Sequence, residues 1–274
     1  FAVAVWDGEK YTQISQMAYI TNPEAVAENQ NAYKEPLTKK GLLIEPELLD
    51  DAFTLGVKHV IINLPFQFIL GSGIDYEYEG KTYHFNKELL DQYDTIVRNF
   101  TAKDLSVTAV ILNSWNDATP DLYYPGVTQT NGVNYYMFNA ATQAGFEDIK
   151  AIASFLAEHY GGTGNGTISN WIIGNEINNQ AWNYIGPMDV DSYVKEYERA
   201  FRVFYTAIKS TSANARVFFS TDYNWNYEAD GSLKYNAKDV IEKFNANVRA
   251  GGQIRLGLAY HPYSVPLDGA GILG

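Results

Sequence analysis

The sequence predicts an α/β protein of the (β/α)8 barrel (TIM-barrel) type, with about six β/α units present and a short β-rich segment before them. Two observations predict this class. From Lys39 onward, apolar strands alternate with amphipathic helices, a pattern typical of a parallel sheet covered by helices. The expected helix-to-strand links are short and the strand-to-helix links are long, so one edge of the sheet carries most insertions. In (β/α) barrels that edge holds the active site.

The expected barrel strands are nearly continuous apolar runs, as strands buried on both faces should be. They are Gly41–Ile44, His59–Phe66, Leu105–Leu112, Asn170–Glu176, Arg216–Thr221 and Ile254–His261. Before them, strands are expected at residues 1–6 and 11–14, joined by a turn at Asp7-Gly8. A further extended stretch is expected at residues 17–20.

The expected helices carry apolar residues at helical spacing on one face. Pro46 suits a first helical position and Gly56 a C-terminal cap, so they bracket the first helix. Asn86 is the expected N-cap of the second helix, which runs to Phe100. The remaining helices are expected at residues 143–160, 191–209 and 237–248.

These elements divide the chain into three parts. Residues 1–23 are expected to be the β-rich remnant of an N-terminal accessory segment, residues 24–38 a polar connection, and residues 39–274 the barrel domain. The first five residues already follow a strand pattern, so we expect the natural N-terminus to lie upstream. A doubly wound open sheet is the alternative, but no glycine-rich phosphate loop follows any expected strand.

Composition excludes several classes of function. The formal charge of −12 disfavours binding to nucleic acid or to an anionic membrane, because both attract basic surfaces. No apolar run reaches the roughly 18 residues expected of a membrane-spanning helix, so no membrane insertion is expected. There is no cysteine, and the four histidines are scattered without a His-x-x-x-His pair, so we expect no metal site and no cofactor.

Polar residues gather where the expected strands end. An ionised carboxylate inside apolar packing costs several kcal/mol unless it is paired, so Glu176 either has a buried partner or faces a polar cleft. Each polar residue taken singly could instead bond loop backbone, but together they predict a site if the sheet curls. The set is Asn63, Asn113, Asn175, Glu176, Asp222, Asn224, His261 and Tyr263.

Aromatic residues crowd the same long links. Sugars stack apolar faces on such rings while their hydroxyls bond amides, carboxylates and imidazoles, so the set indicates a carbohydrate cleft. The alternative is that some rings form small cores within the long loops. The substrate-contact candidates are Trp115, Trp182 and Trp225, accompanied by Tyr123, Tyr124, Tyr135, Tyr136, Tyr184, Tyr223 and Tyr227.

These strand ends carry a family resemblance. Gly174-Asn175-Glu176 on the fourth expected strand, with His261-Pro262-Tyr263 on the sixth, resembles the clan A glycoside hydrolases, which are retaining enzymes on a (β/α)8 barrel. The sequences Thr21-Asn-Pro, Lys39-Lys-Gly41 and Gly-Asn-Glu-Ile-Asn resemble an uncharacterised family of bacterial glycosidases. The resemblance covers about residues 17–265.

The resemblance implies roles for these residues. Glu176 would be the general acid/base, Asn175 would hold a sugar hydroxyl, and His261 and Tyr263 would line the same subsite. Retaining hydrolysis also needs a second carboxylate, and in the clan it ends the seventh strand. We therefore expect the nucleophile beyond Gly274 and this chain alone to be inactive, because the nearby carboxylates Asp222, Glu228 and Asp268 do not match the nucleophile position.

Two other functions stay open at this point. A carbohydrate-binding barrel without catalysis would use the same aromatic and amide groups, with Glu176 as a hydrogen-bond acceptor. A scaffold barrel would instead pack its long aromatic loops on a protein partner. The expected partner is an oligo- or polysaccharide, which in turn suggests an extracellular or periplasmic location.

Overall fold

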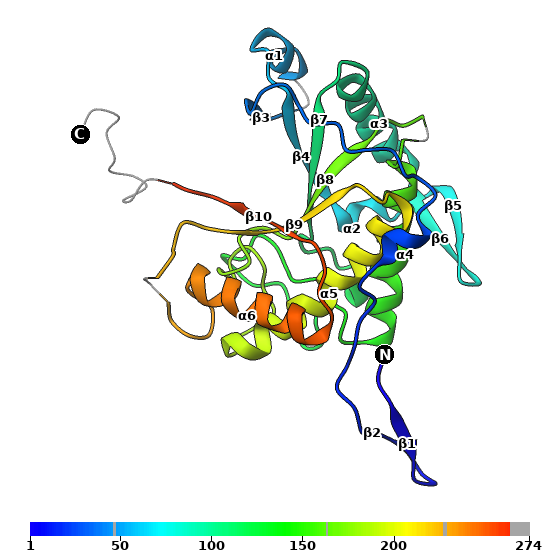
Figure 1. Ribbon diagram of the computed structural model, residues 1–274, viewed down its shortest axis with the longest axis vertical. Helices are drawn as coiled ribbons and strands as arrows, with labels where there is room; N and C mark the ends of the chain where they lie inside the picture. The colour runs from blue at the N-terminus through cyan, green and yellow to red at the C-terminus, as the bar shows by residue number, and fades with distance from the viewer. Residues whose placement is uncertain (46–47, 163, 227–228, 264–274) are drawn as a thin grey trace.

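A computed structural model describes residues 1–45, 48–162, 164–226 and 229–263 (Figure 1). Within these residues, a parallel sheet of six strands in the order β3-β4-β7-β8-β9-β10 forms the centre of the molecule. The sheet is curled into half a barrel, which confirms the predicted fold class. Its strands are β3 (Gly41–Leu43), β4 (His59–Pro65), β7 (Ser106–Leu112), β8 (Ile168–Ile173), β9 (Arg216–Thr221) and β10 (Gly257–Tyr260).

Helices connect successive strands and lie on the convex face of the sheet. Two N-cap side chains bond the first turn of their helices: Asn86 accepts from the Leu89 amide at 3.1 Å, and Thr142 accepts from the Gly145 amide at 3.1 Å. The helices are α1 (Leu49–Thr54), α2 (Phe66–Ile69), α3 (Lys87–Ala102), α4 (Gln143–His159), α5 (Val190–Thr211) and α6 (Ala237–Gly251), with short 3₁₀ turns η1 (Pro23–Val26) and η3 (Pro120–Leu122).

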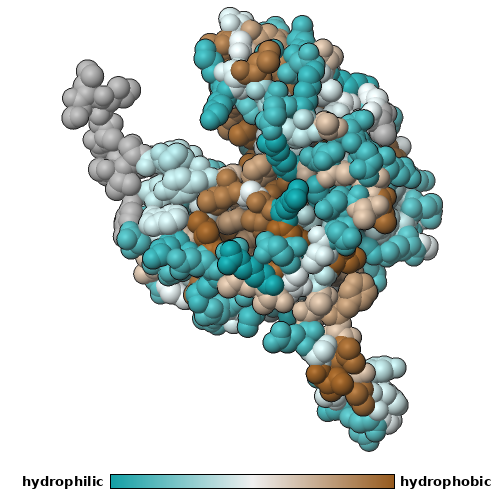
Figure 2. Space-filling model, in the orientation of Figure 1, coloured by the Kyte–Doolittle hydropathy of each residue, from teal (hydrophilic) through white to brown (hydrophobic). Residues whose placement is uncertain are grey.

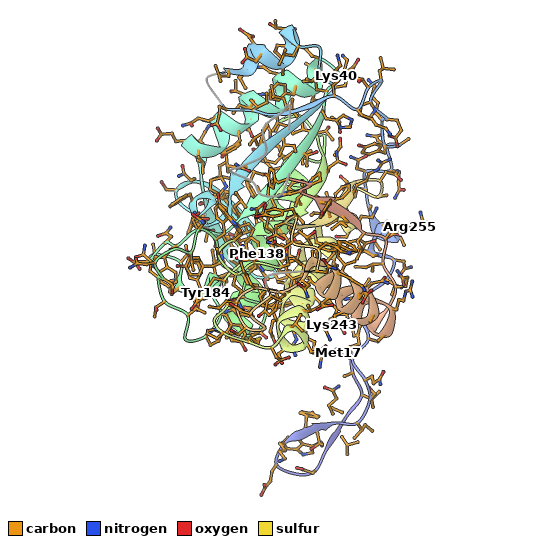
Figure 3. All side chains as sticks on the ribbon, turned by 90° about the vertical axis from the view of Figure 1, so that its left-hand side faces the viewer. Met17, Lys40, Phe138, Tyr184, Lys243 and Arg255 are labelled. Carbon is orange, nitrogen blue, oxygen red and sulfur yellow. The ribbon has the colours of Figure 1, made fainter. Side chains whose placement is uncertain are left out.

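The apolar core has two parts, on opposite faces of the sheet. The large one lies between the sheet and the helices, and Phe138 inside it is 3% exposed (Figure 3). The small one lies on the concave face, where Val110, Leu112 and Ile172 are buried and Tyr135 packs against them. Because side chains alternate along a strand, polar residues in register with the small cluster also face the concavity.

The predicted elements differ from the structure in a few places. The long link after β4 holds α2 and an antiparallel hairpin of β5 (Gly73–Tyr78) and β6 (Lys81–Asn86), which the sequence analysis did not predict. The alternation of residue types in this stretch and the turn residues between the two strands were the sequence signals for this hairpin. Residues 17–20 form no strand, and β8 ends at Ile173, before Glu176. The predicted helix start at Pro46 lies outside the described residues.

The N-terminal residues form an antiparallel hairpin of β1 (Ala4–Trp6) and β2 (Tyr11–Gln13), as predicted. The hairpin projects from the body and exposes apolar side chains, including Trp6 at 53% and Tyr11 at 74% (Figure 2). Residue 19 returns to the body, where its amide donates to the Gly251 carbonyl at 2.8 Å. That the hairpin is the remnant of an accessory segment stays a prediction.

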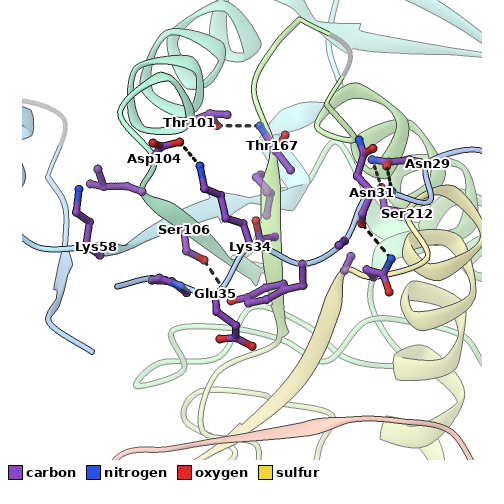
Figure 4. Close-up of a pocket in the computed structure, with 18 of the residues that line it drawn as sticks. Asn29, Asn31, Lys34, Glu35, Lys58, Thr101, Asp104, Ser106, Thr167 and Ser212 are labelled. Atoms are coloured by element: carbon purple, nitrogen blue, oxygen red, sulfur yellow. Dashed lines mark hydrogen bonds and ion pairs between the residues drawn. The ribbon is translucent and has the colours of Figure 1, made fainter. Parts of the chain in front are cut away.

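The segment from Asn29 to Leu37 crosses the amino ends of the strands and borders a cavity of about 440 Å³ (Figure 4). Lys34 forms an ion pair with Asp104, and the Tyr33 hydroxyl lies 3.4 Å from Ser106 Oγ. In Figure 3, Lys40 beside this end of the sheet and Tyr184 beyond the opposite end are widely separated. The cavity therefore lies at the end of the sheet away from the predicted site.

No helix in the described ranges is long and apolar enough to span a membrane.

We predict that Phe244→Ala lowers the free energy of unfolding by about 3–5 kcal/mol, because truncating a buried aromatic ring leaves a cavity. Phe244 is 1% exposed and contacts rings of both α5 and β9, with the Phe219 centroid at 4.9 Å. Urea unfolding monitored by circular dichroism measures the change. Phe68→Ala, at a ring that is 47% exposed, is the control and should cost less than about 1 kcal/mol.

Candidate active site

The backbone turns sharply between the end of β8 and Glu176. Gly174 has φ +75°, and a side chain there would meet Asn183 Oδ1 at 3.1 Å. Glu176 itself has φ +41°, in the left-handed region that residues with a side chain seldom adopt. Such strain costs of order 1–3 kcal/mol and tends to occur at functional sites. The turn aims the Glu176 side chain across the carboxyl end of the sheet toward β10.

Glu176 and His261 are in direct contact. Glu176 Oε1 lies 2.7 Å from His261 Nδ1, and the two side chains are 12% and 27% exposed. The His261 amide donates to the Thr221 carbonyl at 3.0 Å, so β9 holds the histidine in place. The structure thus brings together the two residues that the sequence analysis placed at the ends of the fourth and sixth strands.

Two buried tyrosines of α5 support the turn from below. The Tyr197 hydroxyl donates to the Ile173 carbonyl at 2.6 Å, and the Tyr193 hydroxyl donates to the Ile177 carbonyl at 2.7 Å. Burial raises the pKa of both hydroxyls well above the usual range, so both stay protonated donors. The carbonyls on either side of the turn are therefore anchored to the same helix.

Asp222 is engaged inside the protein. It is 3% exposed, and its Oδ1 accepts from Asn178 Nδ2 at 2.5 Å and from the Asn224 amide at 2.8 Å. Its Oδ2 accepts from Asn224 Nδ2 at 2.9 Å. Both carboxylate oxygens therefore hold the loop after β8 and the turn after β9, and the contact of Asp222 with a substrate stays a prediction.

Asn63 and Asn113 differ in their surroundings. Asn113 is 1% exposed and donates to the Leu122 carbonyl at 3.2 Å, so it supports a loop rather than facing solvent. Asn63 does not end β4, which continues to Pro65. It is exposed and shares the concave face with Ile61, so it is accessible from inside the half-barrel.

Aromatic rings lie on and after β10 and in the loops that follow β7, β8 and β9. On the β10 side, the Tyr263 ring lies 6.1 Å from that of His261, and the Trp225 ring lies 6.4 Å from that of Tyr260. Trp225 and Tyr263 are 45% and 52% exposed. Both rings are therefore accessible to solvent.

On the other side, the loops after β7 and β8 pair through backbone hydrogen bonds, with the Tyr184 amide 2.9 Å from the Tyr135 carbonyl. This places the rings of Tyr135 and Trp182 5.9 Å apart, both partly exposed. Trp115 stacks on Tyr123 at 4.4 Å and its Nε1 donates to Asp117 at 2.7 Å, so the ring is packed within its own loop. Trp115 thus fits the alternative of a small core within a loop, and substrate contact by Tyr135 and Trp182 stays a prediction.

Other predicted residues have simpler outcomes. Asn175 is partly exposed beside Glu176. Tyr227, Glu228 and Asp268 lie outside the described residues. Across the described ranges, no three His, Cys, Asp or Glu side chains are grouped so that they could hold a metal ion.

Sequence reasoning missed four residues that support the site. Ser220 on β9 accepts the Glu176 amide at 2.9 Å, and Asn178 bonds Asp222. Tyr193 and Tyr197 were taken only as part of the apolar stripe of their helix. The available signal for Ser220 was a serine in an apolar strand, two residues before Asp222. The apolar stripe of α5 carries no signal that distinguishes a tyrosine whose hydroxyl bonds a carbonyl.

The class of protein defined by this fold is a parallel (β/α) half-barrel with polar and aromatic residues at its carboxyl edge. Residues 32–272 match the family of unknown function DUF5722, and the chain belongs to that family. The match begins after residues 1–23, the predicted β-rich segment. No curated protein matches the chain.

Several solved structures are similar to the chain at low identity. The β-glycosidase of the hyperthermophile Thermosphaera aggregans is 14% identical over 66% of this chain and 43% of its own, with a TM-score of 0.43. Endoglucanase Cel5A of Thermotoga maritima is 14% identical over 81% of this chain and 56% of its own, with a TM-score of 0.42. The β-glucosidase of Thermotoga maritima in complex with deoxynojirimycin is 15% identical over 78% of this chain and 52% of its own, with a TM-score of 0.46. The chain spans less than two thirds of each, and we draw no functional argument from these likenesses.

We predict that stability falls as the pH rises above about 10, the usual pKa of tyrosine. Between that value and the raised pKa of Tyr193 and Tyr197, the unfolded chain releases protons that the folded chain keeps, which favours unfolding. Tyr197→Phe should lower the free energy of unfolding by about 1–3 kcal/mol at pH 7, because the buried Ile173 carbonyl loses its donor. It should also make the alkaline loss less steep.

Urea unfolding of wild type and variant at pH 7 and at pH 11 measures both effects. Tyr11→Phe is the control, since that ring is 74% exposed. Equal stabilities at the two pH values would contradict the prediction.

Proposed function

We propose that this chain provides the acid/base part of a retaining glycoside hydrolase site that acts on an oligo- or polysaccharide. Glu176 is the general acid/base. The observation that carries the proposal is the 2.7 Å contact between Glu176 Oε1 and His261 Nδ1 at the carboxyl edge of the curled sheet. Both side chains are partly exposed, so a ligand can reach them.

The contact suits a proton-transfer role. Glu176 Oε1 takes the imidazole contact, so Oε2 is the oxygen that would give a proton to the departing glycosidic oxygen. In the second step of a retaining reaction the same oxygen would take a proton from the attacking water. The strained backbone and the support from α5 hold this carboxyl in one orientation, which proton transfer requires.

The retaining reaction also needs a nucleophilic carboxylate about 5–5.5 Å from the acid/base. Asp222 is unsuited to this role, because its two oxygens already accept three hydrogen bonds and the residue is 3% exposed. Glu228 and Asp268 lie outside the described residues. We therefore assign to this chain the acid/base role alone, and the position of the nucleophile stays a prediction from the resemblance.

Neighbouring residues fit carbohydrate recognition. We assign Asn175 to a sugar hydroxyl beside the reacting carbon, and Tyr263 to the same subsite. Trp225 on one side and Trp182 with Tyr135 on the other would stack on sugar faces, because partly exposed rings present an apolar surface to solvent. A polysaccharide substrate would place the protein outside the cytoplasm, and this location is part of the proposal.

We predict that Glu176→Gln lowers kcat on oligosaccharides about 10²–10⁴-fold, because the amide cannot exchange a proton with the leaving group. The assay uses the complete gene product that contains residues 1–274 and a panel of nitrophenyl glycosides and oligosaccharides. Aryl glycosides with acidic leaving groups should be affected less, since their departure needs little protonation. Glu79→Gln is the matched control, at an exposed turn residue that also has a positive φ, +50°.

Equal turnover by wild type and Glu176→Gln would contradict the acid/base assignment. Saturable sugar binding with no turnover by the complete product would favour the alternative, a carbohydrate-binding protein without catalysis. Absence of binding to sugars and to aryl glycosides would contradict both the hydrolase and the carbohydrate-binding function.

We predict that Trp225→Ala weakens oligosaccharide binding about 10-fold, since an exposed ring that stacks on a sugar contributes about 1–1.5 kcal/mol. Isothermal titration calorimetry on the 274-residue chain measures the dissociation constant without requiring turnover. Trp6→Ala is the matched control, because Trp6 is similarly exposed, at 53% against 45%, but lies on the projecting hairpin. If both variants bind as the wild type does, the stacking role of Trp225 is wrong.

A further inference from the structure

Ser220 is the next-to-last residue of β9 and bonds the backbone on both sides of the Glu176 turn. The residue is fully buried on β9, and its Oγ accepts the Glu176 amide at 2.9 Å. The same hydroxyl donates to the Gly174 carbonyl at 3.4 Å. A serine hydroxyl can donate one hydrogen bond and accept others, so one side chain satisfies a backbone donor and a backbone acceptor two residues apart.

This contact falls at the strained point of the chain. Glu176 has φ +41°, and a left-handed conformation costs a residue with a side chain roughly 1–2 kcal/mol. Glutamate has no local hydrogen bond of the kind that lets asparagine or aspartate tolerate this region. Without its acceptor on β9, the Glu176 amide would be left unpaired in a partly buried place. The turn would then be expected to leave the left-handed conformation.

Further contacts tie the same loop to β9. The Ile177 amide donates to the Ser220 carbonyl at 3.0 Å. Asn178 Oδ1 accepts the Asp222 amide at 2.9 Å while its Nδ2 donates to the Asp222 carboxylate at 2.5 Å. Asn178 and Asp222 are 1% and 3% exposed, so these bonds are shielded from water.

His261, the other residue of the contact, is held by the next residue of β9. The His261 amide donates to the Thr221 carbonyl at 3.0 Å. Two adjacent residues of one strand therefore hold the two residues in contact, Ser220 on the Glu176 side and Thr221 on the His261 side. We therefore expect a change at Ser220 to alter the distance between the Glu176 carboxyl and the His261 imidazole, although Ser220 contacts neither group.

We propose that Ser220 is a positioning residue, which holds Glu176 in its left-handed conformation and so sets the Glu176–His261 contact. Its consequence for catalysis rests on the proposed function. Its consequence for the contact itself does not, because the hydrogen bonds belong to the free protein.

The decisive variant is Ser220→Ala, read out by long-range ¹H–¹⁵N NMR of the imidazole rings at neutral pH. The protein has four histidines, and the His261 signals are those missing from His261→Asn. In Ser220→Ala we expect the His261 Nδ1 resonance to shift toward that of an imidazole without a carboxylate partner. Ser220→Cys keeps the side chain nearly the same size with a weaker acceptor, and should lie between wild type and alanine.

Ser154→Ala is the matched control. Ser154 on α4 is also buried, at 7% exposure, and its hydroxyl donates to the Tyr78 hydroxyl of β5 at 3.2 Å. It should cost a similar amount of stability and leave the His261 signals unchanged. Hydrogen exchange of the wild-type Glu176 amide adds a measurement that needs no variant, and we expect protection from exchange.

Unchanged His261 signals in Ser220→Ala and Ser220→Cys would overturn the proposal, as would an unprotected Glu176 amide in the wild type. Equal shifts of the His261 signals in Ser154→Ala would show that the effect of Ser220→Ala reflects a general loss of stability, and would also overturn the proposal.

A kinetic measurement separates this inference from the proposed function. In the complete gene product, Ser220→Ala should lower kcat by up to about 10²-fold with KM within a few-fold of wild type, because a misplaced carboxyl still leaves the sugar contacts intact. Partial recovery in Ser220→Cys is expected. If the wild type turns over no glycoside while the NMR shift appears, the proposed function fails and the positioning role stands. If turnover depends on Glu176 but not on Ser220, the positioning role fails alone.

Discussion

The contact between Glu176 and His261 is the constraint on which the site depends. It joins the ends of β8 and β10, two strands that are not neighbours, so it exists only if β9 between them has the right register. β9 pairs in parallel with both, with Phe218 opposite Ile172 on one side and Gly257 on the other. The backbone ladder of the sheet thus sets the distance between a carboxyl and an imidazole 85 residues apart in sequence.

A strained turn needs support from several directions. The hydroxyls of α5 hold the carbonyls of Ile173 and Ile177, and side chains of β9 hold the loop from the side. Each bond is worth only about 1 kcal/mol, but together they exceed the cost of one left-handed residue. Some buried polar groups around the site, such as Asn178 and Asp222, bond each other and the loop backbone. Among the described residues, the buried atoms Thr221 Oγ1 and Asn224 Oδ1 have no hydrogen-bond partner.

Much of the fold could be predicted because local rules and burial agreed. β9 was predicted at its observed bounds. An apolar run that follows one helix after a short link and precedes the next after a long link fits only a buried strand. Asn86 was predicted as a cap because its chemistry acts within one helical turn. The hairpin of β5 and β6 was missed because a long link was taken as a loop, although its alternating residues had the period of a strand.

The candidate site was predicted less completely. Glu176 and His261 stood out because a charged and an ionisable residue ended apolar strands. Asp222 and Asn113 stood out for the same reason, yet the structure buries them, because an amide or carboxylate at a strand end serves loop backbone as readily as a ligand. Which of these roles a residue takes depends on the loop that packs over it, and the sequence does not reveal that packing.

The sequence by itself determined the class of fold and the strand ends where a site could form. Those properties follow from periodicity and from the cost of burying a charge, both of which act residue by residue. Only the tertiary structure decided that Glu176 meets His261, that Ser220 and two helix tyrosines hold the turn between β8 and α5, and that Glu176 adopts a left-handed conformation. These depend on strand register and on contacts between residues far apart in sequence, where several hydrogen bonds must be satisfied at once.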